Sequence, residues 1–304
     1  MTINPMNIRD LKYLVAIADY QHFGQAAVAC HVSQPALSMQ IKKLETVLGV
    51  QLIERTTKSA RLTDAGKLMT NHAREILYKV DTMKEAAKMA NDPFSGEIRL
   101  GVIPTLAPYL LPHIIKGLNK QFPKLTLFLI EDQTAHLMYK LNQGQIDAAL
   151  LAFPLTEKDL VALPLFEEDF LLAIPDQHSL SKRKHARFAD IENQSLLLLE
   201  DGHCLRDQAL KVCHKANASE TKGFQATSLE TLRHMVASNV GITLIPALAE
   251  RKGDGIHYLS FMNPKPSRMI GMSWRSTSAR TVVLEHMTKV IRNLMSKEKR
   301  VKIV

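Results

Sequence analysis

The feature that most constrains the fold is a turn-rich segment at residues 91–96, Asn-Asp-Pro-Phe-Ser-Gly, because the hydrophobic pattern changes there. Before this segment, apolar residues recur at helical spacing. After it, short strand-like runs alternate with helix-like runs. A chain of 304 residues is long enough for about two domains. We therefore predict a domain boundary here, between a mostly helical part at 1–92 and an α/β part at 93–304.

Residues 1–63 have the pattern of a winged helix-turn-helix. Apolar residues predict helices over 8–20 and 23–30, and a third from Ser33 to Leu48. Ser33 is a good N-cap, and Gly49 is typical of a helix end. Two short strands at 51–55 and 59–63 would form the wing. In such domains the third helix enters the major groove of double-stranded operator DNA.

Charge and polarity around the third helix favour DNA as the partner. Residues 33–63 carry five basic and two acidic side chains, within a chain of net charge +9. We expect short polar side chains early in the helix to face base edges, and basic ones to meet phosphates or the adjacent groove. The candidate DNA-binding residues are Ser33, Gln34, Pro35, Ser38, Lys42 and Arg55. The alternative is a small three-helix domain with a polar face. The basic tail at 289–302 is interpreted as a solvated helix end.

A long helix is predicted over about 64–89 of a linker at 64–92, with Thr63 as its cap. One stripe of it is largely apolar: Leu68, Met69, His72, Ile76, Val80, Met83 and Ala87. An isolated helix of this length must bury such a stripe. A second copy of the chain is the expected partner, and packing on its own domain is the alternative.

The C-terminal part predicts two α/β lobes. Strands at 98–102, 125–130 and 147–151 alternate with helices at 109–121 and 135–143, which is the pattern of a parallel sheet. A second set of strands is expected at 170–174, 196–199, 223–226 and 242–245. A late strand at 269–274 and a helix at 279–295 would return to the first set. Lobe I is thus expected at about 96–166 and 269–304, and lobe II at about 167–268, with a ligand cleft between them.

Two cysteines, Cys204 and Cys213, stand nine positions apart in a segment of good helix formers. On an intact helix nine residues span about 13.5 Å, whereas a disulfide needs Cα atoms about 5.5 to 6 Å apart. The helix and the disulfide therefore exclude each other, which is the behaviour of a switch. The third cysteine, Cys30, is expected to pack in the core of the second helix.

Thr105 and Thr134 each follow a predicted strand, where strand ends face the expected cleft. Each is also a plausible helix cap, so both roles stay open. With three cysteines, no apolar signal segment near the start and no apolar run of about 18 residues, we expect a cytoplasmic protein without a membrane partner.

The arrangement resembles the LysR-type transcriptional regulators over essentially the whole chain, and within them the members that sense hydrogen peroxide. The segments that carry the resemblance are Val32–Ser38, Gly101–Thr105, Leu199–Gln208 and Ala226–Leu232. It implies a periplasmic-binding-protein-like regulatory domain, a homotetramer built as a dimer of dimers, RNA polymerase as a partner and a glutaredoxin- or thioredoxin-type reductant. It also implies antioxidant genes as the regulated targets.

The resemblance implies individual roles as well. Cys204 matches the cysteine that attacks peroxide and Cys213 the one that resolves it. The residues that match the peroxide site are Thr105, Thr134, His203 and Arg268, together with Cys204. Because the thiolate is the nucleophile, we expect the helix N-terminus, Arg206 and Arg268 to favour its ionised form.

Three other readings of the cysteines remain. A metal site would use His203, Cys204, Cys213 and His214, but adjacent helix residues point about 100° apart and seldom share one tetrahedral ion. A thiol peroxidase would use the same chemistry but has no need of a wing or a linker helix. A LysR-type regulator that binds a small organic anion would leave both cysteines inert. We expect a regulator rather than an enzyme, with no cofactor and no metal.

Overall fold

The computed structural model describes residues 6–55, 60–89, 92–155, 157 and 159–304. The chain divides into two compact units, Met1–Asn91 and Asp92–Val304. The described part of the chain contains no helix with both the length and the apolar composition to cross a bilayer.

The first unit is a winged helix-turn-helix, as predicted. Its elements are α1 (Ile8–Tyr20), α2 (Phe23–Ala29), α3 (Gln34–Leu48), β1 (Ile53–Arg55), β2 (Ala60–Leu62) and α4 (Asp64–Met89). The side chain of Asn7 caps α1, and the Ser33 hydroxyl accepts from the Ala36 N–H at the start of α3. Gly49 ends α3 in the left-handed conformation. β1 and β2 pair antiparallel as the wing.

Helix α4 uses two faces differently. Thr63 caps it by accepting from the Gly66 N–H, as expected. One face packs on the first unit's own core through Ala73, with Met69 and Leu77 partly buried against that core. Met69 was expected on the free stripe, so that assignment is wrong. The other face leaves Leu68, Ile76 and Met83 exposed. Of that stripe, the Ala87 side chain lies outside the described residues.

The second unit is an α/β domain with two lobes. Its first lobe contains β3 (Gly96–Val102), α5 (Ala107–Gln121), β4 (Leu125–Glu131), α6 (Thr134–Asn142) and β5 (Ala148–Phe153). β3 pairs in parallel with both β4 and β5, as the alternating pattern predicts. Strand β12 (Ser267–Arg275) and helix α9 (Thr281–Met295) return to this lobe, also as predicted.

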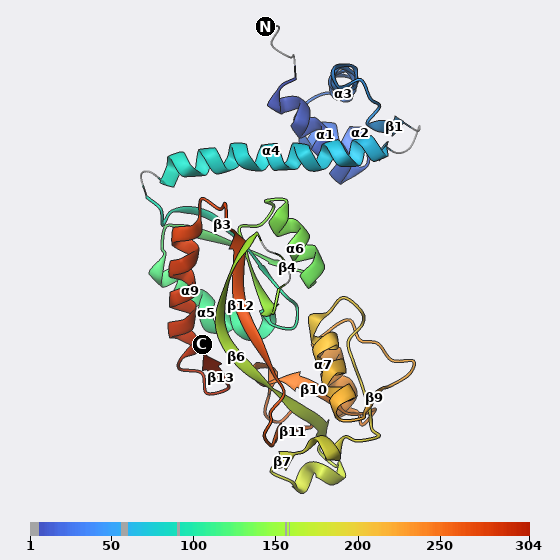
Figure 1. Cartoon of the computed structure of the whole chain (residues 1–304), viewed down its shortest axis with the longest axis vertical. Helices are drawn as coiled ribbons and strands as arrows, with labels where there is room; N and C mark the ends of the chain where they lie inside the picture. The colour runs from blue at the N-terminus through green and yellow to red at the C-terminus, as the bar shows by residue number, and fades with distance from the viewer. Residues whose placement is uncertain (1–5, 56–59, 90–91, 156, 158) are drawn as a thin grey trace. The chain divides into compact units, whose positions relative to one another are not determined.

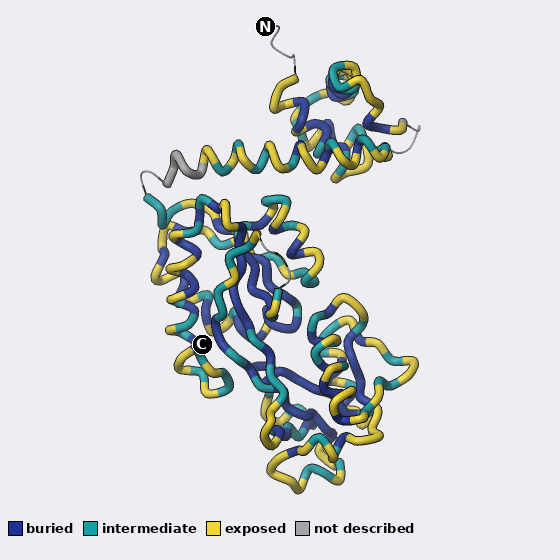
Figure 2. Tube along the Cα trace, in the orientation of Figure 1, coloured by how far each residue is buried: buried dark blue, intermediate teal, exposed yellow. Residues whose placement is uncertain are grey.

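A single long strand, β6 (Leu160–Pro175), runs through both lobes (Figure 1). Its first part pairs with β12, and residues 166–168 also pair with β13 (Val301–Ile303). Its last part pairs with β10 (Thr243–Pro246) and β11 (Ile256–Phe261) of the second lobe. Buried residues follow these central strands, while the outward faces of the helices are exposed (Figure 2).

The second lobe differs in detail from the prediction. Its remaining helices are α7 (Cys204–Lys215), α8 (Leu229–Ala237), η1 (Ser179–Lys182), η2 (Phe188–Asp190) and η3 (Ala247–Ala249). Short strands β7 (His185–Ala186), β8 (Ser195–Leu196) and β9 (Ser219–Glu220) complete it. The strand expected at 223–226 is wrong: only Ala226 forms a bridge there, with Leu199. Strand β11 was not predicted.

Candidate redox site

Helix α7 carries both cysteines of interest. It begins at Cys204 and ends at Lys215, so Cys213 lies in its last turn. All three cysteines are free thiols. Nine residues of intact helix separate the pair by about 13.5 Å along the axis, which is too far for a disulfide. The structure therefore holds the thiol state, with the helix between the cysteines formed.

The two thiols have different surroundings. Cys204 is half-buried, packs against the large core cluster and lines a cavity. Cys213 is buried in a separate cluster that includes Val212 and Phe261. Burial, with a smaller contribution from nearby Glu220, raises the pKa of the Cys213 thiol to about 11. Cys213 is therefore a protonated, unreactive thiol while α7 is intact.

The cavity beside Cys204 has a volume of about 610 Å³. A water molecule occupies about 30 Å³ in the liquid, so the cavity has room for hydrogen peroxide. Arg268 lines the same cavity, and Lys211, Lys215, Lys265 and Asp207 contribute to its charged lining. The cavity thus brings together Cys204 and Arg268, two of the predicted peroxide-site residues.

Thr105 joins this site through Arg268. The guanidinium donates from Nη1 to the Thr105 hydroxyl and from Nη2 to the Thr105 carbonyl, both at 3.1 Å. Leu106 stands at the N-cap of α5, so the alternative that Thr105 caps this helix is wrong. Thr134 is the first residue of α6, after Gln133, so it is not a cap either.

His203 and the preceding loop lie at the start of α7. His203 is 5% exposed, and its Nε2 is 3.9 Å from a Glu200 carboxylate oxygen. Gly202 has a φ of +94°, and the Gln133 side chain lies where a Cβ of residue 202 would stand. Gln133 comes from the first lobe, so α6 and the loop before Cys204 meet there.

Both arginines expected to favour the thiolate have carboxylate partners. Arg206 donates to Glu220 at 2.5 and 2.8 Å and pairs with Asp201 at 2.8 Å. Arg268 pairs with Glu168 at 2.8 Å. Each guanidinium is therefore paired with a carboxylate, and the expectation that Arg206 and Arg268 favour the Cys204 thiolate stays a prediction. Cys204 is itself the first residue of α7, at the N-terminus of the helix.

Sequence reasoning missed Glu168, Gln133 and Glu220. Glu168 lies in the acidic run 167–169, and such a run is typical of a loop or an exposed strand edge. In the structure Glu168 lies inside β6. Within the described residues, no group of three His, Cys, Asp or Glu side chains gathers as metal ligands.

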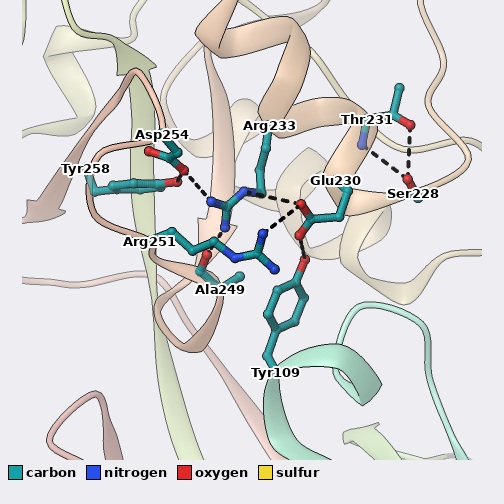
Figure 3. A network of polar contacts seen from close by, with 9 residues as sticks. All are labelled: Tyr109, Ser228, Glu230, Thr231, Arg233, Ala249, Arg251, Asp254 and Tyr258. Atoms are coloured by element: carbon teal, nitrogen blue, oxygen red, sulfur yellow. Dashed lines mark hydrogen bonds and ion pairs between the residues drawn. The ribbon is translucent and has the colours of Figure 1, made fainter. Parts of the chain in front are cut away.

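A polar network joins α5 of the first lobe to α8 and nearby residues of the second lobe (Figure 3). The Tyr109 hydroxyl of α5 donates to Glu230 of α8 at 2.7 Å. Glu230 also pairs with Arg233 at 3.8 Å and with Arg251 at 3.3 Å. Arg233 donates to the Ala249 carbonyl of η3 and pairs with Asp254. The Asp254 carboxylate also accepts from the Tyr258 hydroxyl at 2.6 Å. A shift of one lobe relative to the other therefore has to break or rearrange the bond between Tyr109 and Glu230, which joins the first lobe to the second.

The predicted DNA-contacting residues share one helix and the wing. Leu37, Ile41 and Leu44 of α3 are buried in the core of the first unit. Ser33, Gln34, Pro35 and Lys42 are exposed, and Ser38 is partly exposed. Arg55 ends β1, and its side chain lies outside the described residues. Helix α3 thus presents a polar and basic surface opposite its buried face.

Comparison with known proteins places these features in a family. Residues 8–67 match the bacterial regulatory helix-turn-helix of the lysR family, and residues 91–296 match the LysR substrate binding domain. The chain is 48% identical to the DNA-binding transcriptional dual regulator OxyR of Escherichia coli, covering 95% of this chain and 96% of that protein. It is 47% identical to the hydrogen peroxide-inducible genes activator of Pectobacterium carotovorum, covering 95% and 97%.

Solved structures agree with the sequence relatives. A full-length OxyR variant from Pseudomonas aeruginosa is 35% identical, with a TM-score of 0.79, covering 94% of this chain and 95% of that one. The oxidised form of OxyR is 46% identical with a TM-score of 0.63, covering 68% of this chain and all of that one. With both family models matched in order and relatives aligned over nearly their whole length, the chain belongs to the LysR family of bacterial transcriptional regulators.

Proposed function

We propose that this chain is a hydrogen-peroxide-responsive transcriptional regulator whose switch is the pair Cys204 and Cys213. One observation supports this most directly: a single helix, α7, begins at a half-buried cysteine open to a cavity and carries a second, fully buried cysteine near its end. The name of the relative from Pectobacterium carotovorum, a hydrogen peroxide-inducible genes activator, points to the same stimulus.

The first chemical step takes place at Cys204. Its thiolate attacks one oxygen of hydrogen peroxide; an S–O bond forms, the O–O bond breaks, and the leaving hydroxide takes a proton to become water. Arg268, Thr105, Thr134 and His203 are the residues proposed to hold the peroxide. The sulfur is oxidised by two electrons to a sulfenic acid.

The second step requires a change of structure. The Cys213 sulfur attacks the sulfenic sulfur of Cys204, an S–S bond forms, and water leaves. Because the two Cα atoms must approach from about 13.5 Å to about 6 Å, helix over 205–212 has to be lost. Cys213 also has to leave its apolar cluster, which lets its thiol ionise.

The readout is a change in the DNA-bound assembly that activates antioxidant genes. The remodelled α7 segment alters contacts between subunits of a homotetramer, a dimer of dimers bound to operator DNA in the cytoplasm. These altered contacts shift the spacing of the two pairs of DNA-binding domains, and RNA polymerase responds to that spacing. A glutaredoxin- or thioredoxin-type reductant restores the thiols. The protein acts as a regulator and not as a peroxide-consuming enzyme.

The test is a footprint on operator DNA with the protein reduced and then treated with peroxide, combined with mass spectrometry. Wild type and Cys30→Ser should lose two hydrogens and change the footprint. Cys204→Ser should do neither, and Cys213→Ser should stop at the sulfenic acid. A Cys204→Ser protein that still changed its footprint on addition of peroxide would rule out this mechanism.

DNA contacts are tested separately. Ser38→Ala should lower affinity for the operator by about 1–3 kcal/mol and relax specificity. Arg55→Ala should weaken binding to all sequences alike and flatten the salt dependence by about one unit. Unchanged operator affinity in both variants would show that α3 and the wing are not the reading surface.

A further inference from the structure

Glu168 is a fully buried charged residue that the chemistry above does not use. It lies in β6, between Arg268 of β12 and Val301 of β13 as cross-strand partners. The side chains of Glu168 and Arg268 are both 0% exposed. Burying a carboxylate is costly unless its oxygens are fully hydrogen-bonded, so its partners define what it does.

Each Glu168 oxygen has one strong donor. Oε1 accepts from the Leu248 backbone N–H of η3 at 2.7 Å, and Oε2 accepts from Arg268 Nε at 2.8 Å. The remaining nitrogens of Arg268 both donate to Thr105. The guanidinium is thus held along one edge by Glu168 and along the opposite edge by Thr105, at the wall of the cavity that Cys204 lines.

We propose that Glu168 is a positioning residue for the reaction of Cys204 with peroxide, acting through Arg268; this rests on the proposed function. When the O–O bond breaks, negative charge develops on the leaving oxygen. Donors that face this charge are most effective when they are fixed before the reaction. Glu168 does not touch peroxide. It fixes the plane of the guanidinium and, through it, the hydroxyl of Thr105, which accepts from Arg268 and so keeps its own hydrogen for donation.

Glu168→Gln is the informative substitution. Both partners of Glu168 are donors, and an amide offers one acceptor oxygen and one N–H group. The amide oxygen of the variant can therefore accept from either the Leu248 N–H or the Arg268 Nε–H. Its NH₂ group then faces the other donor. Glu167→Gln is the matched control, because Glu167 is the preceding residue of β6 and its hydrogen bond from the Ser267 hydroxyl at 2.6 Å survives with an amide oxygen.

The assay measures two second-order rates at Cys204 in a Cys213→Ser background. One is oxidation by hydrogen peroxide, and the other is alkylation by iodoacetamide, which reports the thiolate and its access but requires no O–O cleavage. In Glu168→Gln we expect peroxide to oxidise Cys204 at least tenfold more slowly than in the parent. Iodoacetamide should alkylate Cys204 at a rate within twofold of the parent. Glu167→Gln should match the parent in both.

Two results would overturn the inference: oxidation of Glu168→Gln at the parental rate, or an equal loss of both rates, which would indicate a merely structural role. If Glu168→Gln does not fold, Glu168→Asp is tested by the same comparison of the oxidation rate with the alkylation rate. Aspartate keeps both acceptor oxygens but draws Arg268 away by one methylene. A parent protein that is not oxidised at all would instead refute the proposed function itself.

Discussion

If the disulfide can form only after α7 is lost, the stability of that helix should set the rate of closure. Lys211 allows this to be tested without touching either cysteine. It is exposed and lies in the interior of α7, so Lys211→Ala and Lys211→Gly remove the same side chain and differ in little except helix propensity. The comparison is between these two variants, because the lysine also lines the cavity and its loss is common to both.

The expected magnitude follows from that propensity. Glycine is about 1 kcal/mol less favourable than alanine in a helix interior. A difference of about 1 kcal/mol changes a local unfolding equilibrium by about fivefold. Where helix loss is a rapid equilibrium before closure, Lys211→Gly should therefore form the disulfide about five times faster than Lys211→Ala, with the first step at Cys204 unchanged.

Rapid-quench mass spectrometry after a short pulse of peroxide separates the two steps, because sulfenic acid and disulfide differ by one water. The same pair of substitutions at Lys289, an exposed residue in α9, is the control. It should lower global stability to a similar degree and leave the closure rate unchanged. Equal closure rates for Lys211→Ala and Lys211→Gly would show that loss of α7 does not limit closure.

Three further outcomes are expected. Gly202→Ala should reduce the free energy of unfolding by about 1–2 kcal/mol in urea titrations, because residue 202 has a φ of +94° and Gln133 occupies the Cβ position. An unchanged urea midpoint would contradict this. The hydrogen bond from Arg300 lowers the pKa of Glu298 from 4.5 to about 2, so it adds stability that is present above pH 4.5 and lost as pH falls through 2. The stability of Glu298→Gln should therefore depend less steeply on pH in that window, and an acid-unfolding profile identical to wild type would refute the assignment. Ile76→Glu with Val80→Glu should give monomers by sedimentation velocity, because the outer face of α4 exposes Leu68, Ile76 and Met83; an unaltered sedimentation coefficient would exclude this face as the dimer seam.

Much of the local structure was predictable because it depends on residues close together in the chain. The hydroxyls of the caps Ser33 and Thr63 accept hydrogen bonds from backbone N–H groups three positions on. The parallel order of β3, β4 and β5 follows from their alternation with helices. The mutual exclusion of helix α7 and a disulfide depends only on the spacing of Cys204 and Cys213 and on the geometry of a helix.

The electrostatics of the site was decided by tertiary structure alone. The pair of Glu168 and Arg268 joins residues 100 positions apart, and the bond from Arg268 to Thr105 spans 163 positions. Arg206 is held by Glu220 of the separate strand β9, although its place beside Cys204 in the chain suggested a role at the sulfur. Residue type and spacing define which groups are charged, but burial and pairing depend on which strands become neighbours. The sequence could therefore name the cysteines of the switch, whereas only the pairing of β6 with β12 placed a buried carboxylate beside Arg268.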